Sequence, residues 1–303
     1  MEKQENLCDV IIQGEGLTAA SLPSVVANRR FVARDTARGA VRLTGIPESD
    51  AMNLVGLFQS SGLDAVAVPK GLRLTDFRLF ASDLDSTLAS VETLDTVAKE
   101  SGYGDSVAKI TEAAMRGEIR DYAQSLEERI RAIKGCPQRN FIRFSETMPF
   151  NPGAEKLVAA CRAAGLEFHI VTGGFDESAG PAARRLGADG FHCNKLEVKD
   201  GLLTGRVYGP DENGGKIVDS DGKKRIVEGL CGKLGIGLGQ AITAGDGWND
   251  VKMLAAAGLG AAYHAKPRVR AIVPHQVNVL GLDSILNWFE DGPEWAAKAG
   301  FAD

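Results

Sequence analysis

Four short polar segments of the sequence carry side chains whose chemistry is complementary. They are Asp-Leu-Asp-Ser-Thr at 83–87, Thr-Gly-Gly at 172–174, Lys223, and Gly-Asp-Gly-Trp-Asn-Asp at 245–250. Two carboxylates next to an apolar run are unfavourable unless a cation lies between them. Asp83 and Asp246 offer the hard oxygen ligands that Mg²⁺ prefers. The Thr172 hydroxyl, the neighbouring backbone amides and Lys223 could bind phosphate oxygens, so the four segments together indicate a metal-assisted phosphate site.

Each segment taken alone has an ordinary structural explanation. Acidic and glycine-containing turns are common in solvated loops, and a lone lysine is usually a surface charge. The placement of the segments favours a functional explanation, because each one follows an expected strand or begins an expected helix. Ligands of doubly wound sheets bind at the carboxyl ends of the strands. Alternation along an extended chain would also place the Asp83 and Asp85 side chains on the same side, facing one metal and one phosphate.

Alternating strand and helix patterns from residue 73 onward supply those strand ends. The expected strands are 77–83, 166–172, 189–193, 240–246, 258–265 and 276–281. Residues 195–209 are expected to form a hairpin, because Asp200-Gly201 supplies a two-residue turn. Helical patterns such as 153–165 separate the strands. This alternation predicts an α/β fold with a doubly wound parallel sheet.

Two further regions accompany this core. Residues 91–147 are almost wholly helical in pattern, and their position after the first core strand predicts an inserted helical cap at about 91–150. Residues 1–72 predict a small N-terminal α+β domain, of the ferredoxin-like or ACT-like kind. Its expected elements are strands at 8–12 and 64–68, a strand pair within 30–46, and helices at 18–29 and 49–62. The remaining residues, 73–303, form the expected core with its cap.

Bulk properties argue against several classes of protein. The net charge is −5 and no Lys/Arg block occurs, which argues against a nucleic-acid partner. No apolar run approaches about 18 residues, so no membrane span is expected. The five cysteines are scattered without a Cys-x-x-Cys pair, which favours reduced thiols and disfavours a zinc site. With a polar, acidic N-terminus, these features predict a cytoplasmic protein.

The four segments resemble, in order, the four motifs of the haloacid dehalogenase-like phosphatases. The motif-like residues are 83–87, 171–175, Lys223 and 245–250. Further similarity at 82–95, 111–130, 203–209 and 257–267 is to members of this superfamily that hydrolyse O-phospho-L-serine. The resemblance covers about residues 78–280. It implies a Rossmann-like core of the haloacid dehalogenase kind, with a cap that closes over the substrate and excludes water.

The resemblance also implies roles for individual residues. Asp83 would be the nucleophile that forms an aspartyl-phosphate, and Asp85 would exchange protons with the leaving oxygen and the incoming water. The implied ligands of Mg²⁺ are Asp83, Asp85 through its backbone carbonyl, and Asp246. The implied substrate-binding residues of the core are Thr172, Gly173, Gly174, Lys223 and Asn249. Asp250 would support the metal ligands from outside the coordination shell.

Two residues of the expected cap indicate the substrate. Glu92 aligns with the family's ammonium-binding glutamate, and Arg129 aligns with the arginine that binds the substrate carboxylate. Each has an ordinary explanation as well, because a glutamate in a first helical turn favours the helix dipole and Arg129 could lie on a solvated helix face. Because both residues stand in the family positions, together they imply a small-molecule substrate that carries an ammonium group and a carboxylate. That substrate is O-phospho-L-serine.

The sequence departs from the family pattern at Trp248, where a small residue is common. An indole there could narrow the entrance, alter the preferred substrate or pack under the cap. Thr172 replaces the more usual serine, but it keeps the hydroxyl.

Two other functions stay open from the sequence. One is a related capped phosphatase or phosphotransferase acting on another small phosphomonoester, such as phosphoethanolamine or phosphohomoserine. The other is a non-catalytic protein that senses an amino acid. The N-terminal domain carries no motif that decides among serine binding, formation of a homodimer and a structural role.

Overall fold

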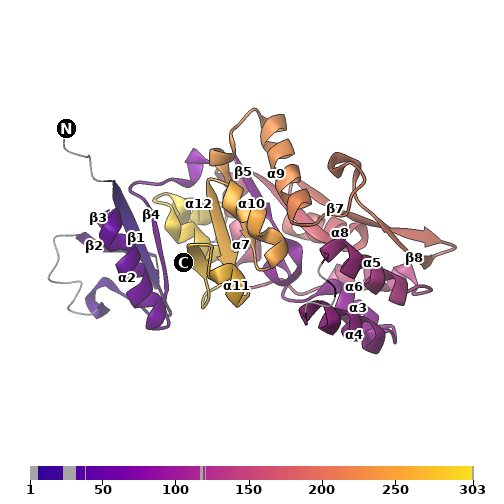
Figure 1. The fold of residues 1–303 in the computed structure, drawn as a ribbon. Helices are drawn as coiled ribbons and strands as arrows, with labels where there is room; N and C mark the ends of the chain where they lie inside the picture. Colours follow the sequence, from indigo (N-terminus) through magenta and orange to yellow (C-terminus); the bar gives the residue numbers. More distant parts are fainter. Residues whose placement is uncertain (1–5, 23–31, 38, 117–118, 120, 302–303) are drawn as a thin grey trace.

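The computed structural model describes residues 6–22, 32–37, 39–116, 119 and 121–301 (Figure 1). These residues form a small sheet domain, a larger α/β core and a set of cap helices. Within these ranges, no helix combines the length and the apolar character needed to cross a membrane.

The N-terminal domain is a four-stranded antiparallel sheet in the order β2-β3-β1-β4. Its elements are β1 (Leu7–Gln13), β2 (Val32–Ala37), β3 (Ala40–Pro47), α2 (Glu48–Ser60) and β4 (Asp64–Pro69). Val10 on β1 packs against Leu54 and Phe58 on α2, because one face of the strand and one stripe of the helix are apolar. The helix expected at 18–29 lies largely outside the described residues, and its described part contains a single 3₁₀ turn at Ala19–Ser21.

The core is a seven-stranded sheet in the order β11-β10-β9-β5-β6-β7-β8. Its strands are β5 (Leu79–Ser82), β6 (Glu167–Phe175), β7 (Gly190–Lys199), β8 (Leu202–Tyr208), β9 (Ala241–Gly245), β10 (Leu259–Tyr263) and β11 (His275–Val277). All neighbours are parallel except β7 and β8. Asp200 and Gly201 form the turn between them with φ of 52° and 76°, as a two-residue hairpin requires. The predicted parallel sheet is confirmed, but β7 is one continuous strand rather than a strand followed by a separate hairpin.

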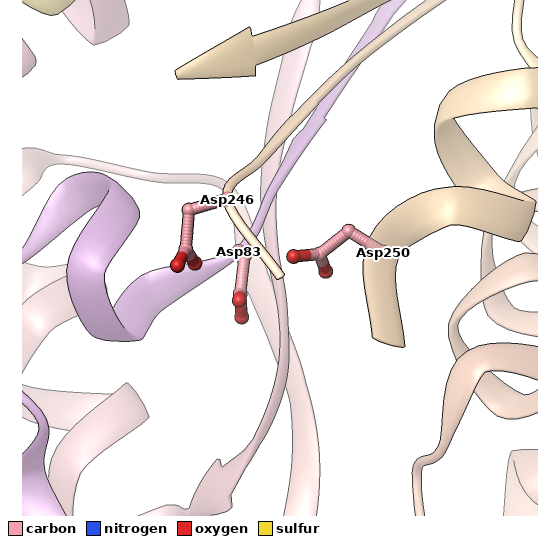
Figure 2. A group of neighbouring side chains, drawn as sticks. All are labelled: Asp83, Asp246 and Asp250. Atoms are coloured by element: carbon pink, nitrogen blue, oxygen red, sulfur yellow. The ribbon is translucent and has the colours of Figure 1, made fainter. Parts of the chain in front are cut away.

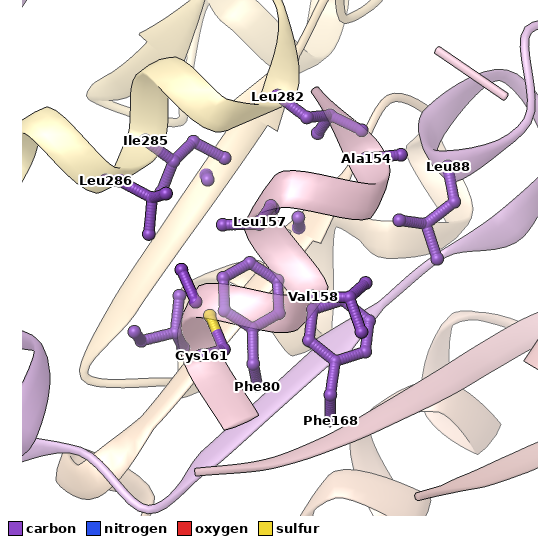
Figure 3. Packing of buried hydrophobic residues seen from close by; sticks show 14 of the residues in the cluster. Phe80, Leu88, Ala154, Leu157, Val158, Cys161, Phe168, Leu282, Ile285 and Leu286 are labelled. Atoms are coloured by element: carbon purple, nitrogen blue, oxygen red, sulfur yellow. The ribbon is translucent and has the colours of Figure 1, made fainter. Parts of the chain in front are cut away.

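Helices cover both faces of the core sheet. They are α7 (Ala154–Ala163), α8 (Asp176–Leu186), α9 (Ser220–Leu234), α10 (Val251–Ala256), α11 (Pro267–Arg270) and α12 (Gly292–Lys298). Residues of α7, α8 and α12 belong to the apolar cluster of one face, and residues of α9 and α10 belong to that of the other. Figure 3 shows the first cluster, in which Phe80 of β5 and Phe168 of β6 lie beneath α7. Their rings stack 4.8 Å apart, which fixes the two central strands that carry the site.

The cap consists of four helices between β5 and α7: α3 (Thr93–Glu100), α4 (Gly104–Met115), α5 (Tyr122–Ala132) and α6 (Gln138–Thr147). They pack around an apolar cluster that includes Val97, Leu126 and Phe141 and that extends to Phe175 of β6 and Leu203 of β8. This arrangement agrees with the helical block predicted at 91–147.

The cap is joined to the core at two ends. At the covalent end, the two connecting segments pair through a β-bridge between Ala89 and Phe150. At the far end, Gly135 N–H donates to the Leu203 carbonyl at 2.8 Å, and Leu203 N–H donates to the Cys136 carbonyl at 2.9 Å. Leu203 belongs to β8, so the core hairpin reaches out to hold the α5–α6 half of the cap.

The N-terminal domain is fixed to the core by polar contacts as well as by apolar packing. The buried Asp64 carboxylate accepts hydrogen bonds from the backbone N–H groups of Asn278 at 2.6 Å and Leu280 at 2.9 Å. Arg42 and Asp9 form an ion pair at 3.0 Å in which neither side chain is exposed, and Arg42 also donates to the Asn287 carbonyl.

Candidate active site

The loop that follows β5 presents two aspartates in different ways. Asp83 directly follows the strand, and its Oδ1 accepts a hydrogen bond from the Leu84 N–H at 2.8 Å. Residues Leu84–Leu88 then form a π-helical turn in which Ser86 has φ of 58°. The strand ends at Ser82, so the two aspartates lie on the loop, although the backbone angles of Asp83 (ψ 161°) and Asp85 (ψ 133°) remain extended. Both side chains line the same cavity.

Asp85 is held by the first turn of the cap. Its Oδ1 accepts hydrogen bonds from the backbone N–H of Thr93 at 2.9 Å and from the Thr93 hydroxyl. Burial, together with the negative charge of Glu92, raises the pKa of Asp85 to about 6. A carboxyl group with that pKa can give and take a proton near neutral pH.

Three carboxylates converge at the ends of β5 and β9 (Figure 2). Asp83, Asp246 and Asp250, which we call the acidic group, offer oxygen atoms that all lie within 4.8 Å of one another. All three residues are buried, with at most 5 % of their surface exposed. The structure thus adds Asp250 to Asp83 and Asp246, whereas the Asp85 carboxylate points to Thr93.

Lys223 neutralises part of the acidic group. Its Nζ lies 2.7 Å from Asp83 Oδ1 and 2.6 Å from Asp250 Oδ1, and its side chain is fully buried. The Asp219 side chain begins α9 by accepting from the Gly222 N–H, which places Lys223 in the first turn. Burial alone would lower the pKa of Lys223, but the two carboxylates more than offset it and raise that pKa.

The acidic group keeps excess negative charge, because its three carboxylates face two lysines, Lys223 and, at 3.7 Å from Asp246, Lys266. Burial and the neighbouring Asp250 raise the pKa of Asp83, and the same two causes raise the pKa of Asp246 to about 7. A divalent cation with oxygen ligands would relieve this repulsion, and the oxygen-only donor set is the kind that Mg²⁺ prefers. The residues present therefore fit the expected cofactor, with Asp83 and Asp246 as the side-chain ligands.

The end of β6 forms another side of the cavity, with Thr172, Gly173 and Gly174 in its lining. The Thr172 hydroxyl accepts a hydrogen bond from the Gly174 N–H at 2.9 Å, which leaves its own proton available to a ligand. A Cβ at Gly173 would collide with the Tyr122 hydroxyl of the cap, and one at Gly174 would lie 3.2 Å from Asp85 Oδ2. Gly173 therefore lets the cap approach β6 closely, and the contact at Gly174 with the loop after β5 is tighter than usual.

A cavity of about 330 Å³ lies between the cap and the ends of the core strands, which form its floor. Its core side consists of Asp83, Asp85, Thr172, Gly173, Gly174, Phe175, Asp246, Asn249 and Lys266. Its cap side consists of Glu92, Thr93, Leu94, Asp95, Thr111, Tyr122, Leu126 and Arg129. The structure therefore brings together the predicted site residues, with Lys223 and Asp250 packed directly behind the floor.

Several polar residues of this lining, among them Thr93, which bonds Asp85, were not predicted from the sequence. Lys266 reaches to 3.7 Å from Asp246 Oδ2, and Asp95 and Thr111 stand on the cap side. Lys266 lies in the similar stretch 257–267, so that similarity was an available signal. Asp95 and Thr111 also lie in similar stretches, but helical periodicity alone does not separate a cavity-facing polar residue from a solvated one.

Trp248 does not line the cavity. Its side chain is half exposed, and the Arg268 guanidinium lies 4.5 Å from the centre of the indole ring. The cation–π contact holds the indole on the outer side of the loop. Of the three possibilities raised by the sequence, narrowing of the entrance and packing under the cap do not match this position.

Comparisons with known proteins agree with this geometry. Residues 80–255 match the family model described as haloacid dehalogenase-like hydrolase. A phosphoserine phosphatase of Albidiferax ferrireducens is 46% identical over 72% of this chain and 92% of its own length. One of a Polaromonas species is 45% identical over 75% of this chain and 96% of its own.

Solved structures give the same result. The unliganded probable phosphoserine phosphatase of Vibrio cholerae has a TM-score of 0.78 and 32% identity, and the match covers 96% of this chain and 88% of that one. A substrate-bound phosphoserine phosphatase has a TM-score of 0.63 and 33% identity over 70% of this chain and 98% of that one. The chain belongs to the haloacid dehalogenase-like hydrolases. The curated relatives named here, within that family, are phosphoserine phosphatases.

Proposed function

We propose that this protein is a Mg²⁺-dependent phosphomonoester hydrolase that converts O-phospho-L-serine to L-serine and phosphate through an aspartyl-phosphate intermediate. The observation that supports this proposal most directly is the placement of the acidic group and Lys223 beneath a cavity whose cap side holds Glu92 and Arg129. The names of the relatives support the substrate.

Asp83 acts as the nucleophile in this mechanism. Its carboxylate attacks phosphorus, the bond from phosphorus to the serine oxygen breaks, and Asp83 carries the phosphoryl group. Lys223, at 2.7 Å from Asp83 Oδ1, offsets negative charge on the carboxylate and on the phosphoryl oxygens. Asp83 and Asp246 would hold Mg²⁺, which would supply further positive charge next to those oxygens. Water then attacks phosphorus and regenerates the Asp83 carboxylate.

Asp85 moves the proton in both half-reactions. It protonates the departing serine oxygen, and as a carboxylate it then accepts a proton from the attacking water. The two hydrogen bonds from Thr93 hold Oδ1, while Oδ2 faces Gly174 at the phosphate side of the cavity. Because Thr93 opens the first cap helix, the position of Asp85 is coupled to the cap.

The remaining residues hold the substrate. The Thr172 hydroxyl, the Gly173 backbone and Asn249 surround the phosphoryl group, and Asp250 keeps Lys223 and the Gly247 N–H in place. On the cap side, Arg129 binds the substrate carboxylate and Glu92 the ammonium group.

A phosphate-release assay tests this proposal. The substrates are O-phospho-L-serine, phosphoethanolamine and phosphohomoserine, each with Mg²⁺ and with a chelator. We expect Mg²⁺-dependent turnover that is fastest on O-phospho-L-serine. Equal rates on phosphoserine and phosphoethanolamine would remove the role given to Arg129. Binding without turnover of any of the three would favour the sensor and refute the hydrolase.

A further inference from the structure

Two buried polar atoms on the cap side of the cavity have no hydrogen-bond partner among the residues that the structure describes. They are Oδ1 of Asp95 on α3 and Oγ1 of Thr111 on α4. Both residues line the cavity above the acidic group. Because a buried polar atom without a partner is unfavourable, such atoms commonly meet a ligand or a water molecule. This part of the cavity is therefore complementary to a group that forms hydrogen bonds.

The neighbouring charged side chains indicate which kind of ligand group would form these hydrogen bonds. Glu92 uses its Oε1 to accept a hydrogen bond from the Ser86 hydroxyl at 2.8 Å. Arg129 donates from Nε to the Ser125 carbonyl at 3.4 Å. Burial raises the pKa of Asp95 and the charge of Arg129 lowers it; the charge of Glu92 raises this pKa further, and that of Lys266 lowers it. Asp95 still keeps one carboxylate oxygen unpaired, which suits a donor that carries positive charge.

We propose that Asp95 and Thr111 complete the binding site for the ammonium group of the substrate. This inference rests on the hydrolysis of phosphoserine proposed above. An ammonium group has three N–H donors, and Glu92, Asp95 and Thr111 together offer two carboxylates and a hydroxyl oxygen as acceptors. Arg129 remains for the substrate carboxylate.

The charges on the cap side give this arrangement a consequence for specificity. Glu92 and Asp95 are two negative charges against the single positive charge of Arg129. A phosphorylated acid without an ammonium group brings more negative charge to these carboxylates and leaves Asp95 unpaired. The Asp95 carboxylate therefore disfavours phosphorylated acids that lack an ammonium group, and it favours phosphorylated amino acids.

The experiment compares wild type and Asp95→Asn on three phosphomonoesters. O-phospho-L-serine has both charged groups, phosphoethanolamine has the ammonium alone, and 3-phosphooxypropanoate has the carboxylate alone. For the variant, we expect KM to rise about tenfold on the first two, the effect of one lost charge-assisted hydrogen bond, with kcat little changed. KM for 3-phosphooxypropanoate should not rise, because that molecule has no ammonium group.

Two outcomes would overturn the role given to Asp95. An unchanged KM for phosphoserine and phosphoethanolamine would show that Asp95 does not bind the ammonium group. A rise confined to phosphoserine and 3-phosphooxypropanoate would show that Asp95 acts through Arg129 instead. The control is Asp105→Asn, which removes an exposed aspartate of the same cap that is outside the cavity lining, and its KM values should equal those of wild type.

Thr111 provides a second test that does not change charge. Thr111→Val keeps the shape and loses the hydroxyl, whereas Thr111→Ser keeps the hydroxyl. We expect the valine variant to raise KM for the two ammonium-containing substrates severalfold and the serine variant to restore it. Equal KM values for the valine and serine variants would remove Thr111 from the site.

Failure of this inference is distinguishable from failure of the proposed function. A wild-type protein that does not prefer phosphoserine refutes the function, whatever the variants do. A wild-type protein that prefers phosphoserine, with KM unaffected in Asp95→Asn and Thr111→Val, refutes the inference alone.

Discussion

The N-terminal domain and the active site both bury charge, but they balance it differently. In the N-terminal domain the Asp9 carboxylate meets Arg42 at 3.0 Å, and Asp64 is surrounded by backbone N–H donors. In the active site three carboxylates face two lysines, the buried Lys223 and, beside Asp246, the exposed Lys266. The Arg42–Asp9 pair is neutral as a whole and has a structural role. The acidic group keeps net negative charge, which is available to bind a cation.

The largest expected effect is that of Asp83→Asn on activity. The amide cannot form the aspartyl-phosphate, so kcat should fall by at least about a thousandfold. The midpoint of thermal unfolding without Mg²⁺ should stay the same or rise, because one of three repelling charges is removed. Phosphate release and thermal unfolding measure the two quantities.

The matched control is Asp221→Asn, which removes an exposed carboxylate paired with Lys252 at 2.7 Å. It should leave kcat unchanged. Substantial residual turnover in Asp83→Asn would refute the covalent mechanism.

The opposite pattern is expected for Arg42→Met in the balanced pair. This change leaves the Asp9 carboxylate buried without its partner, which should cost about 3–5 kcal/mol of the free energy of unfolding. The kcat of the folded variant should equal that of wild type, because the pair lies outside the cavity. Denaturant unfolding and steady-state kinetics are the measurements.

Arg34→Met is the control for this change. Arg34 lies on the neighbouring strand β2 in an exposed ion pair with Glu290, and its loss should cost less than about 1 kcal/mol. Similar losses for the two arginines would contradict the contrast between buried and exposed pairs.

Addition of Mg²⁺ should stabilise the unbalanced site. A cation that binds only the folded protein adds about 2.7 kcal/mol at a hundred times its Kd. The thermal midpoint of wild type should therefore rise with the Mg²⁺ concentration. The rise should be much smaller in Asp246→Asn, which lacks one carboxylate of the acidic group. An equal rise in both proteins would place the cation elsewhere.

The smallest expected effect concerns pH and the contact between the two sheets. The ring of His275 on β11 bonds the Ala67 carbonyl of β4 at 3.2 Å, and burial lowers the pKa of His275. The unfolded chain takes up a proton near pH 6.5, but the folded protein does so only at lower pH. This contribution to stability is present above about pH 6.5 and is lost as the pH falls toward the pKa of the folded state.

His275→Gln removes the titrating group from this contact. The free energy of unfolding of the variant should therefore depend less on pH between about 5 and 7 than that of wild type. Parallel pH profiles for the two proteins would exclude His275 as the cause.

The sequence predicted the strand ends and the residues at them, because each such segment is local and follows a clear apolar run. It did not predict the turn at Ser86, where φ is positive and the Ser86 N–H donates to the Val91 carbonyl further along the chain. It also missed Asp95 and Thr111, because an unpaired atom is defined by the tertiary surroundings and not by spacing along a helix.

The hydrogen bonds between β8 and the loop after α5 determine how the cavity can open. A lid attached at one end could swing as a rigid body, but this cap is attached at both ends, through the Ala89–Phe150 bridge and through Leu203. Substrate entry is therefore expected to proceed by local loosening of α3 and α4, while α5 and α6 stay with the core. Backbone amides of α4 should then exchange hydrogen faster than those of α5, which carries Arg129.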